Sequence, residues 1–437
     1  MGSPRTVAFH TLGCKLNFSE TSSLQRMFED QGYHVAEAYD HADVFVLNTC
    51  SVTDFADRKC RKFVRRVLRQ NPQARVVVTG CYAQLKPTEI ADIEGVDMVL
   101  GAAEKFRMLD YIDQLDGAKS KGTVHTTEIS EVSTFNNAFS FGDRTRSFLK
   151  VQDGCDYNCS FCTIPQARGR SRSDTLDQVV ANAQQIGESG VREIVLTGVN
   201  LGDFGNGTEV IEGERPKKND LFIDLIRALD RVDSVERFRI SSIEPNLCTG
   251  EIIEFVAGSS RFMPHFHMPL QSGNNKQLAM MRRRYRRELY EDRVKLIKKV
   301  MPHACIGVDV IVGFPGETDE DFLETQRFIE SLDVSYLHVF TYSERPNTPA
   351  ATMSGEIDMN KRRKRNEILR HLSDQKKRSF YEQHLHEDRT VLLEPGKQPG
   401  QLAGWTDNYI RLNVAGGEED VNTMRRVRIL PEHLDYN

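Results

Sequence analysis

Hydrophobic residues in the first quarter of the chain form short, β-branched runs that alternate with amphipathic stretches. Four of these runs have the length and composition of buried strands. They are residues 6–13 (TVAFHTLG), 44–49 (VFVLNT), 75–80 (RVVVTG) and 98–101 (MVLG). Between the first two, residues 19–33 begin with Ser and Glu and end at a glycine, which is typical of a helix. The alternation predicts a small parallel α/β sheet in a domain spanning residues 4–115.

A longer alternation occupies residues 146–372, after a polar segment, residues 116–145, that we interpret as a linker. Six candidate strands are separated by helix-like segments. They are residues 147–152 (SFLKVQ), 193–199 (EIVLTGV), 237–243 (RFRISSI), 265–270 (HFHMPL), 305–313 (CIGVDVIVG) and 336–342 (YLHVFTY). This pattern predicts a partial (βα)6 barrel, with its chemistry at the carboxyl ends of the strands.

The carboxy-terminal part has a different pattern. Residues 361–386 predict one long basic helix, and residues 376–437 contain short strands separated by Gly, Asn and Asp turns. Such a tail is typical of a small β-barrel. The expected fold class is therefore α/β, with a small parallel α/β domain, a partial barrel and a small carboxy-terminal β-barrel.

The composition of the chain indicates the class of protein and the compartment in which we expect it. The chain has 437 residues, enough for about three domains. Hydrophobic content of 39% and charged content of 28% are typical of a soluble globular protein. No apolar run approaches the roughly 18 residues of a membrane span, and no signal peptide is evident, so we expect a cytoplasmic protein without a membrane partner. In that compartment nine cysteines indicate metal binding or catalysis and not disulfides.

The distribution of charge is more informative than its sum. The net charge of −5 predicts no nucleic-acid partner by itself, but residues 58–69, 281–287 and 361–365 are three basic clusters. Together they favour an anionic partner, although each is also explained as a solvated face. The candidate contacts in the first cluster are Arg61, Arg65 and Arg69.

Three cysteines lie within the eight residues CDYNCSFC. They are Cys155, Cys159 and Cys162. Structural zinc sites usually have paired CxxC units or a CxxC with a pair of histidines, so zinc is the weaker interpretation. Three thiolates from one loop hold three corners of a 4Fe-4S cluster and leave its fourth iron open for another ligand.

Three further cysteines share a different context. Cys14, Cys50 and Cys81 each follow the carboxyl end of an apolar strand. Because the carboxyl ends of parallel strands lie at one edge of a sheet, the three thiols are expected to converge on a second metal site. The alternative is three buried structural cysteines, since free cysteine is commonly buried. Cys60, Cys248 and Cys305 lack this context and are expected in the core.

The CxxxCxxC motif after the first barrel strand resembles the radical S-adenosylmethionine (SAM) superfamily. The resemblance implies that the open iron binds SAM and that an electron from the cluster cleaves it to methionine and a 5′-deoxyadenosyl radical. Phe161 is similar in position to the family's apolar contact to adenine, or is a core aromatic. Further contacts implied by the resemblance, each also explicable as a turn or cap, are Gly198, Asn200, Ser242, Glu244, Gln271 and Asp309.

With two cysteine triads and three domains, the whole chain resembles the methylthiotransferase family. That resemblance implies two 4Fe-4S clusters, the second being an auxiliary cluster on Cys14, Cys50 and Cys81 that carries the sulfur to be inserted. The tail resembles a TRAM domain, an RNA-binding module. A radical is required because the C–H bond at adenine C2 is too weakly acidic for an ordinary side-chain base.

The segments around the first three cysteines resemble one branch of the family. TLGCKLN, NTCSVTDFADRKCRKFVRR and VTGCYAQLKP are most similar to the branch that modifies N6-threonylcarbamoyladenosine beside the tRNA anticodon. The expected product is 2-methylthio-N6-threonylcarbamoyladenosine. Two other branches are alternatives, acting on isopentenyladenosine in tRNA or on an aspartate of a ribosomal protein. An alternative of another class is a non-catalytic iron–sulfur RNA-binding protein.

Partners and remaining side chains complete the expectations. The family implies a tRNA anticodon stem-loop as substrate and an external electron donor, and we expect a monomer. Arg345 is a candidate partner for a carboxylate on the nucleoside, or a surface salt bridge. Trp405 is a candidate platform for stacking on bases. His265 and His267 alternate onto one face of a strand, where hydrogen-bonded cavity histidines are preferred to a metal pair.

Overall fold

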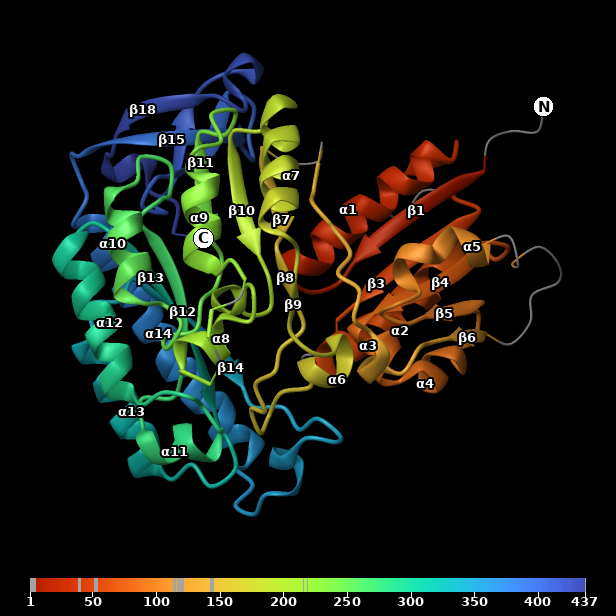
Figure 1. Ribbon diagram of the computed structural model, residues 1–437, viewed down its shortest axis with the longest axis horizontal. Coiled ribbons are helices and arrows are strands. Elements are labelled where there is room, and N and C mark those ends of the chain that lie inside the picture. Colours follow the sequence, from red (N-terminus) through yellow and green to blue (C-terminus); the bar gives the residue numbers. More distant parts are fainter. Residues whose placement is uncertain are drawn as a thin grey trace. The chain divides into compact units, whose positions relative to one another are not determined.

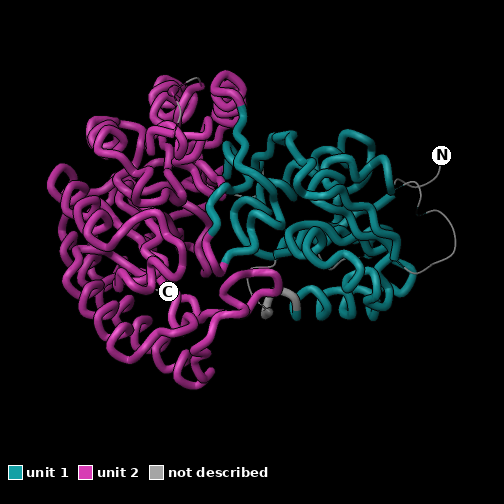
Figure 2. The backbone as a smooth tube through the Cα atoms, turned by 60° about the horizontal axis from the view of Figure 1, so that its bottom comes forward, with its two compact units in different colours: residues 1–141, 148–158, 162–174 teal, residues 142–147, 159–161, 175–437 magenta. Residues whose placement is uncertain are grey.

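The computed structural model describes residues 5–37, 41–50, 54–112, 115, 122–141, 145–214, 216–217 and 219–436. The chain separates into two compact units (Figure 2). Unit 1 comprises residues 1–141, 148–158 and 162–174, and unit 2 comprises residues 142–147, 159–161 and 175–437. None of the helices described is both long enough and apolar enough to span a bilayer.

Unit 1 contains a six-stranded sheet in the order β2-β1-β3-β4-β5-β6, with every neighbouring pair parallel. Its strands are β1 (Thr6–Thr11), β2 (His34–Ala36), β3 (Val44–Thr49), β4 (Arg75–Gly80), β5 (Met98–Leu100) and β6 (Thr123–His125). The four expected strands are confirmed. Strand β6 lies within the expected linker, because residues 123–125 pair with the exposed edge of β5.

Helices cover both faces of this sheet (Figure 1). They are α1 (Lys15–Asp30), α2 (Asp54–Gln70), α3 (Cys81–Leu85), α4 (Pro87–Ala91), α5 (Met108–Ile112) and α6 (Ile164–Arg168). One core layer joins α1 and α5 to one face of the strands, and a second joins α2, α3 and α4 to the other. Helix α1 begins four residues earlier than expected, so Cys14 is its N-cap residue.

The barrel strands form two three-stranded sheets, β11-β10-β7 and β12-β13-β14. The six expected strands are confirmed as β7 (Arg146–Lys150), β10 (Glu193–Thr197), β11 (Arg237–Ile240), β12 (His265–Gln271), β13 (Cys305–Val312) and β14 (Tyr336–Thr341). Helices of unit 2 are α7 (Leu176–Glu188), α8 (Gly207–Ile211), α9 (Phe222–Leu229), α10 (Gly250–Gly258), α11 (Asn275–Met280), α12 (Arg287–Val300) and α13 (Asp319–Ser331). A short antiparallel pair, β8 (Gln152–Asp153) and β9 (Arg172–Ser173), flanks the CxxxCxxC loop within unit 1.

The tail belongs to unit 2 and begins with the expected basic helix, α14 (Met359–Glu382). Four strands follow in an antiparallel sheet of order β17-β16-β15-β18. They are β15 (Asp388–Pro395), β16 (Gln401–Thr406), β17 (Arg411–Ala415) and β18 (Met424–Arg428).

The tail sheet is joined to the barrel strands by buried contacts. Cys305 of β13 is part of the hydrophobic core of the tail. Two buried arginines of β11 donate to carbonyl oxygens of the tail, Arg237 to Thr390 at 2.6 Å and Arg239 to Thr406 at 2.6 Å. The core of the tail is therefore closed on one side by strand β13, and β11 is hydrogen-bonded to the tail strands.

Candidate functional site

The three amino-terminal cysteines of the expected second site follow adjacent strands. Cys14, Cys50 and Cys81 come after β1, β3 and β4, which are neighbours in the parallel sheet. Their loops therefore leave the sheet at one edge. All nine cysteines of the chain are free thiols, and Cys50 and Cys81 are buried while Cys14 is exposed.

Glycines bring these loops into contact. Gly13 precedes Cys14 with a φ of +110°, and a Cβ atom there would lie 2.6 Å from the Cβ of Cys50. Gly80 precedes Cys81 with a φ of +98°, and a Cβ there would lie 2.3 Å from the carbonyl oxygen of Thr49. Both approaches require a residue without a side chain. The loops of the first and third cysteines thus pack on the segment that carries the second.

A buried charge network lies in the same unit. Glu20 of α1 forms ion pairs with Lys105 at 2.6 Å and with Lys150 at 3.0 Å. Arg168 at the end of α6 lies 3.0 Å from both Glu20 and Asp153. Each of the five side chains is at most 5% exposed. Three cations face two carboxylates, so the network carries excess positive charge in a dry environment.

The network reaches the cysteine loops through Asn17. The second nitrogen of Arg168 donates to Asn17 Oδ1 at 2.6 Å. The Asn17 amide in turn donates to the carbonyls of Leu12 and Thr49 at 2.8 and 2.9 Å. Cys81 and Arg168 line one cavity of about 10 Å³, room for about one water molecule. Burial raises the pKa of the Cys81 thiol, and the positive charge of Arg168 opposes that effect.

The CxxxCxxC loop is shared between the two units. Cys155 and Cys162 belong to unit 1, where each sulfur accepts a backbone N–H at 3.4 Å, from Tyr157 and Ile164 respectively. Gly154, before Cys155, has a φ of +70°, and a Cβ there would lie 2.0 Å from a backbone oxygen. Cys14, Cys81 and Cys155 thus each follow a glycine whose place no other residue could take without a clash.

Cys159 belongs to unit 2 and has an arginine beside it. The guanidinium of Arg283 donates to the sulfur of Cys159 at 3.0 Å and also forms a short ion pair with Glu244. Burial raises the pKa of the Cys159 thiol, while Arg283 favours its thiolate. Arg283 comes from the basic cluster at 281–287, in which Arg282, Arg284 and Arg286 are exposed. The side chain of Arg283 itself is buried and is neutralised by Glu244.

The expected SAM contacts follow the carboxyl ends of three barrel strands. Gly198 and Asn200 follow β10, Ser242 and Glu244 follow β11, and Gln271 ends β12. Gln271 is distinctive, because its φ is +65° and its Oε1 is buried without a hydrogen bond from any described residue. A strained residue with an unsatisfied buried amide is typical of a ligand-binding position.

Comparison with known proteins decides the family. Residues 6–101 match Uncharacterized protein family UPF0004, and residues 149–329 match the Radical SAM superfamily. A protein of Bacillus subtilis (strain 168) named threonylcarbamoyladenosine tRNA methylthiotransferase MtaB is 41% identical over 444 residues, covering 99% of this chain and 95% of its own length. The chain belongs to the MtaB family of radical SAM methylthiotransferases.

Further relatives include one protein of the same name, one named for a related tRNA reaction and one solved structure. An Aquifex aeolicus (strain VF5) protein of the same name is 37% identical, covering 97% of this chain and 100% of its own length. A Fusobacterium nucleatum protein named tRNA-2-methylthio-N(6)-dimethylallyladenosine synthase is 33% identical, covering 87% of this chain and 86% of its own length. Among solved structures, the radical SAM methyltransferase TsrM from Kitasatospora setae has a TM-score of 0.55 over 80% of this chain and 77% of its own, at 16% identity. That likeness concerns the fold alone.

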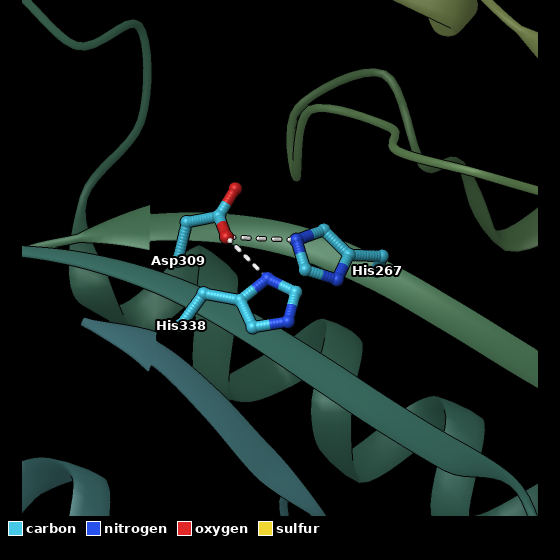
Figure 3. Close-up of side chains that lie close together, drawn as sticks. All are labelled: His267, Asp309 and His338. Atoms are coloured by element: carbon cyan, nitrogen blue, oxygen red, sulfur yellow. Dashed lines mark ion pairs between the residues drawn. The ribbon is translucent and has the colours of Figure 1, made fainter. Parts of the chain in front are cut away.

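In this MtaB-family chain the sixth expected SAM contact, Asp309, has two imidazoles as neighbours. His267 of β12 and His338 of β14 both approach the same oxygen of its carboxylate (Figure 3). Burial raises the pKa of Asp309, but the two histidines lower it further than burial raises it. His265 and His267 both contact the Tyr336 hydroxyl, at 3.1 and 3.3 Å, so the hydrogen bonds expected for both rings are present.

Three other candidates have defined surroundings within unit 2. Phe161 packs edge-on against Phe314, with ring centroids 6.5 Å apart, and is half-buried. Arg345 is buried, which excludes the alternative of a surface salt bridge. Trp405 stacks on Tyr409 at 4.2 Å and is half-buried, so one face of its ring is already covered by the tail itself.

The basic clusters differ in what they leave exposed. On α2, Arg65, Arg66 and Arg69 are exposed, whereas Arg61 is half-buried and pairs with Glu89 at 2.5 Å. In the cluster at 361–365 the two arginines at 362 and 365 are buried and hydrogen-bonded inside the unit. The face of α2 is therefore the basic surface that best fits an external polyanion.

Sequence reasoning missed the residues that support the cysteines. Arg168 and Arg283 are arginines in segments that the sequence marks only as polar or basic, and Glu20 lies in a polar run, NFSETSS, that is buried along α1. That run carried a signal. A helix start without apolar periodicity, directly after a ligand cysteine, indicates polar residues that face the site.

Proposed function

We propose that this protein methylthiolates C2 of N6-threonylcarbamoyladenosine beside the tRNA anticodon, giving 2-methylthio-N6-threonylcarbamoyladenosine. The observation that carries the proposal is 41% identity over nearly the full length of a protein named for this reaction, against 33% for one named for the dimethylallyl substrate. Convergence of three cysteine loops at one sheet edge supports it. The isopentenyl and ribosomal-protein substrates are the competing assignments.

The two cysteine triads fit two 4Fe-4S clusters. Cys155, Cys159 and Cys162 would hold the cluster that binds SAM, and Cys14, Cys50 and Cys81 the auxiliary cluster. The donor sets suit these groups, because each triad offers three free thiols and leaves one iron without a protein ligand. When bound, the first cluster and SAM supply the radical that removes the C2 hydrogen, and the second supplies the sulfur.

Around these sites the chain's own residues position and stabilise charge. Arg168 and Asn17 fix the loops of Cys14 and Cys50, and the positive charge of Arg168 opposes the effect of burial on the pKa of Cys81. Arg283 gives the same support to Cys159. Gln271, with Gly198, Asn200, Ser242 and Glu244, is proposed to contact SAM. Phe161 is proposed to contact its adenine.

The partners follow from the same proposal. The exposed basic face of α2 is proposed to contact the phosphates of the anticodon stem-loop, since exposed arginines contribute to RNA binding by releasing counterions. Buried Arg345 is proposed to bind the threonylcarbamoyl carboxylate, a group that arginine recognises with two hydrogen bonds. We further propose a cytoplasmic monomer that receives electrons from an external donor and an RNA-binding, TRAM-like tail.

Mass spectrometry of tRNA nucleosides tests the substrate. Deleting the gene should abolish 2-methylthio-N6-threonylcarbamoyladenosine and leave its unthiolated precursor, and the wild-type gene on a plasmid should restore the product. A Cys155→Ala gene should not restore it. Loss of the isopentenyl derivative instead would assign the chain to the other tRNA branch.

A further inference from the structure

Two histidines and one aspartate meet on adjacent strands of the second barrel sheet. Asp309 of β13 pairs in register with His338 of β14, and His267 projects from the neighbouring strand β12. Asp309 Oδ1 lies 2.9 Å from His267 Nε2 and 3.3 Å from His338 Nδ1 (Figure 3). The three donor atoms all lie within 4.8 Å of one another. None of the six proposed cluster cysteines takes part.

Hydrogen bonding does not account for this arrangement. Asp309 Oδ1 is buried and accepts no well-formed hydrogen bond from any described residue, despite the two ring nitrogens so near it. A buried carboxylate oxygen is costly without a positive partner, and at these distances the partner is either a protonated imidazole or a cation held between the rings and the carboxylate. Three electron-rich atoms that converge without an aligned N–H are the arrangement of a cation site.

The surrounding groups fit metal ligation by His267. Its other ring nitrogen, Nδ1, lies 3.3 Å from the hydroxyl of Tyr336. Metal-binding histidines usually donate this second N–H to a neighbouring acceptor, which leaves the first nitrogen's lone pair for the ion. The Tyr336 hydroxyl has one hydrogen and also contacts His265 at 3.1 Å, so it can donate to His265 and accept from His267.

We propose that His267, Asp309 and His338 bind one divalent transition-metal ion of the zinc class, separate from the iron–sulfur clusters. Ligand bonds of about 2.0–2.2 Å place neighbouring donor atoms about 3.3 Å apart around a tetrahedral ion, close to the separations present here. Three protein ligands leave one position for water or a ligand. The side chain of His338 is 56% exposed, so the ion is accessible from solvent. The site goes beyond the proposed methylthiotransferase function and does not depend on it, and it replaces the SAM contact that the family resemblance implied for Asp309.

Zinc binding by the fully reconstituted enzyme tests the site. With iron in both clusters, the six cluster cysteines are occupied and cannot take up zinc, and the other three cysteines are buried. The protein is dialysed anaerobically against buffered micromolar free Zn²⁺, and zinc and iron per chain are measured by elemental mass spectrometry. The wild type should hold one zinc ion per chain with its iron unchanged, and Asp309→Asn should hold none.

Two further variants separate ligation from folding. His338→Gln alters a half-exposed ring, so folding is not threatened, and it should lose the zinc. Tyr336→Phe should weaken zinc binding by about 10- to 100-fold, the usual effect of removing a supporting partner. His371→Ala, an exposed histidine on α14, is the matched control and should bind zinc normally.

Either of two results would overturn the proposal. One is a wild-type protein that holds no zinc at full iron content, and the other is zinc that persists in both Asp309→Asn and His338→Gln. His267 and His338 would then be only hydrogen-bonded or ion-paired to Asp309, with no metal between them. Tests of tRNA thiolation are read separately, so failure of one proposal does not count against the other.

Discussion

At the scale of single residues, Glu20 is the carboxylate that all three buried cations contact, and Asp153 pairs with two of them. Burial raises its pKa, but Arg168, Lys105 and Lys150 more than offset this and hold the pKa well below the usual range. Removing one partner of a buried ion pair leaves the others without compensation and typically costs about 3–5 kcal/mol. Glu20 therefore contributes to the stability of unit 1 as well as to the arrangement of the cysteine loops.

Glu20→Gln should lower the free energy of unfolding by about 3 kcal/mol at neutral pH, measured by urea denaturation of the reconstituted protein. Since the folded pKa is depressed, this contribution is complete above the ordinary glutamate pKa of about 4.3 and declines as the pH falls below it. The difference between variant and wild type should shrink accordingly in acid. Glu89→Gln, at an exposed pair with Arg61, is the control and should cost about 1 kcal/mol or less.

The candidate cysteines could be selected from the sequence, whereas the residues beside them could not. Spacing and strand-end context are local properties that mark candidate ligand cysteines directly. Burial of Arg168 and Arg283 depends on which segments meet in the folded chain, and a basic run such as 281–287 reads the same whether one arginine turns inward or not. The Asp309 site required the register of three strands, which alternation along one strand does not provide.

At the scale of elements, helix α2 separates an apolar face from a basic one. Cys60, Phe63 and Val64 are buried in the core under the sheet, while the arginines at 65, 66 and 69 are exposed. The expectation that Cys60 lies in the core is confirmed. Strand boundaries followed the β-branched runs, but β6 was missed because its three residues have no such run and are held by edge pairing with β5.

Reversing charge at Arg65, Arg66 and Arg69 should weaken tRNA binding and flatten its salt dependence. For each phosphate that the protein no longer neutralises, the slope of log K against log salt should fall by about 0.7–0.9, because fewer counterions are released. Binding isotherms at several salt concentrations measure this. The control is Arg363→Glu, Lys364→Glu and Arg370→Glu on α14, with the same charge change on exposed positions. If the α2 variant and the α14 variant bind tRNA with the same affinity and the same salt dependence, the basic face of α2 is only a solvated face.

At the scale of the whole molecule, the two cysteine triads should be separable. Changing Cys155, Cys159 and Cys162 to Ala should abolish reductive cleavage of SAM, measured as 5′-deoxyadenosine under anaerobic conditions. Changing Cys14, Cys50 and Cys81 to Ala should preserve that cleavage, remove about half of the iron and yield no thiolated nucleoside. Full iron with intact thiolation in the second variant would remove the auxiliary cluster from the proposal. Wild-type protein that binds tRNA but never cleaves SAM would indicate a binding protein instead.

The buried arginines of β11 constrain how this chain can be re-engineered. Arg237 and Arg239 lie near buried Glu193 and direct their remaining N–H groups to backbone carbonyl oxygens of the tail. Exchanging the tail for that of a distant relative would keep those charges buried while shifting the backbone that accepts their hydrogen bonds. Chimeras meant to transfer RNA preference should therefore carry β11 together with the tail, so that the arginines and the backbone they contact come from the same protein.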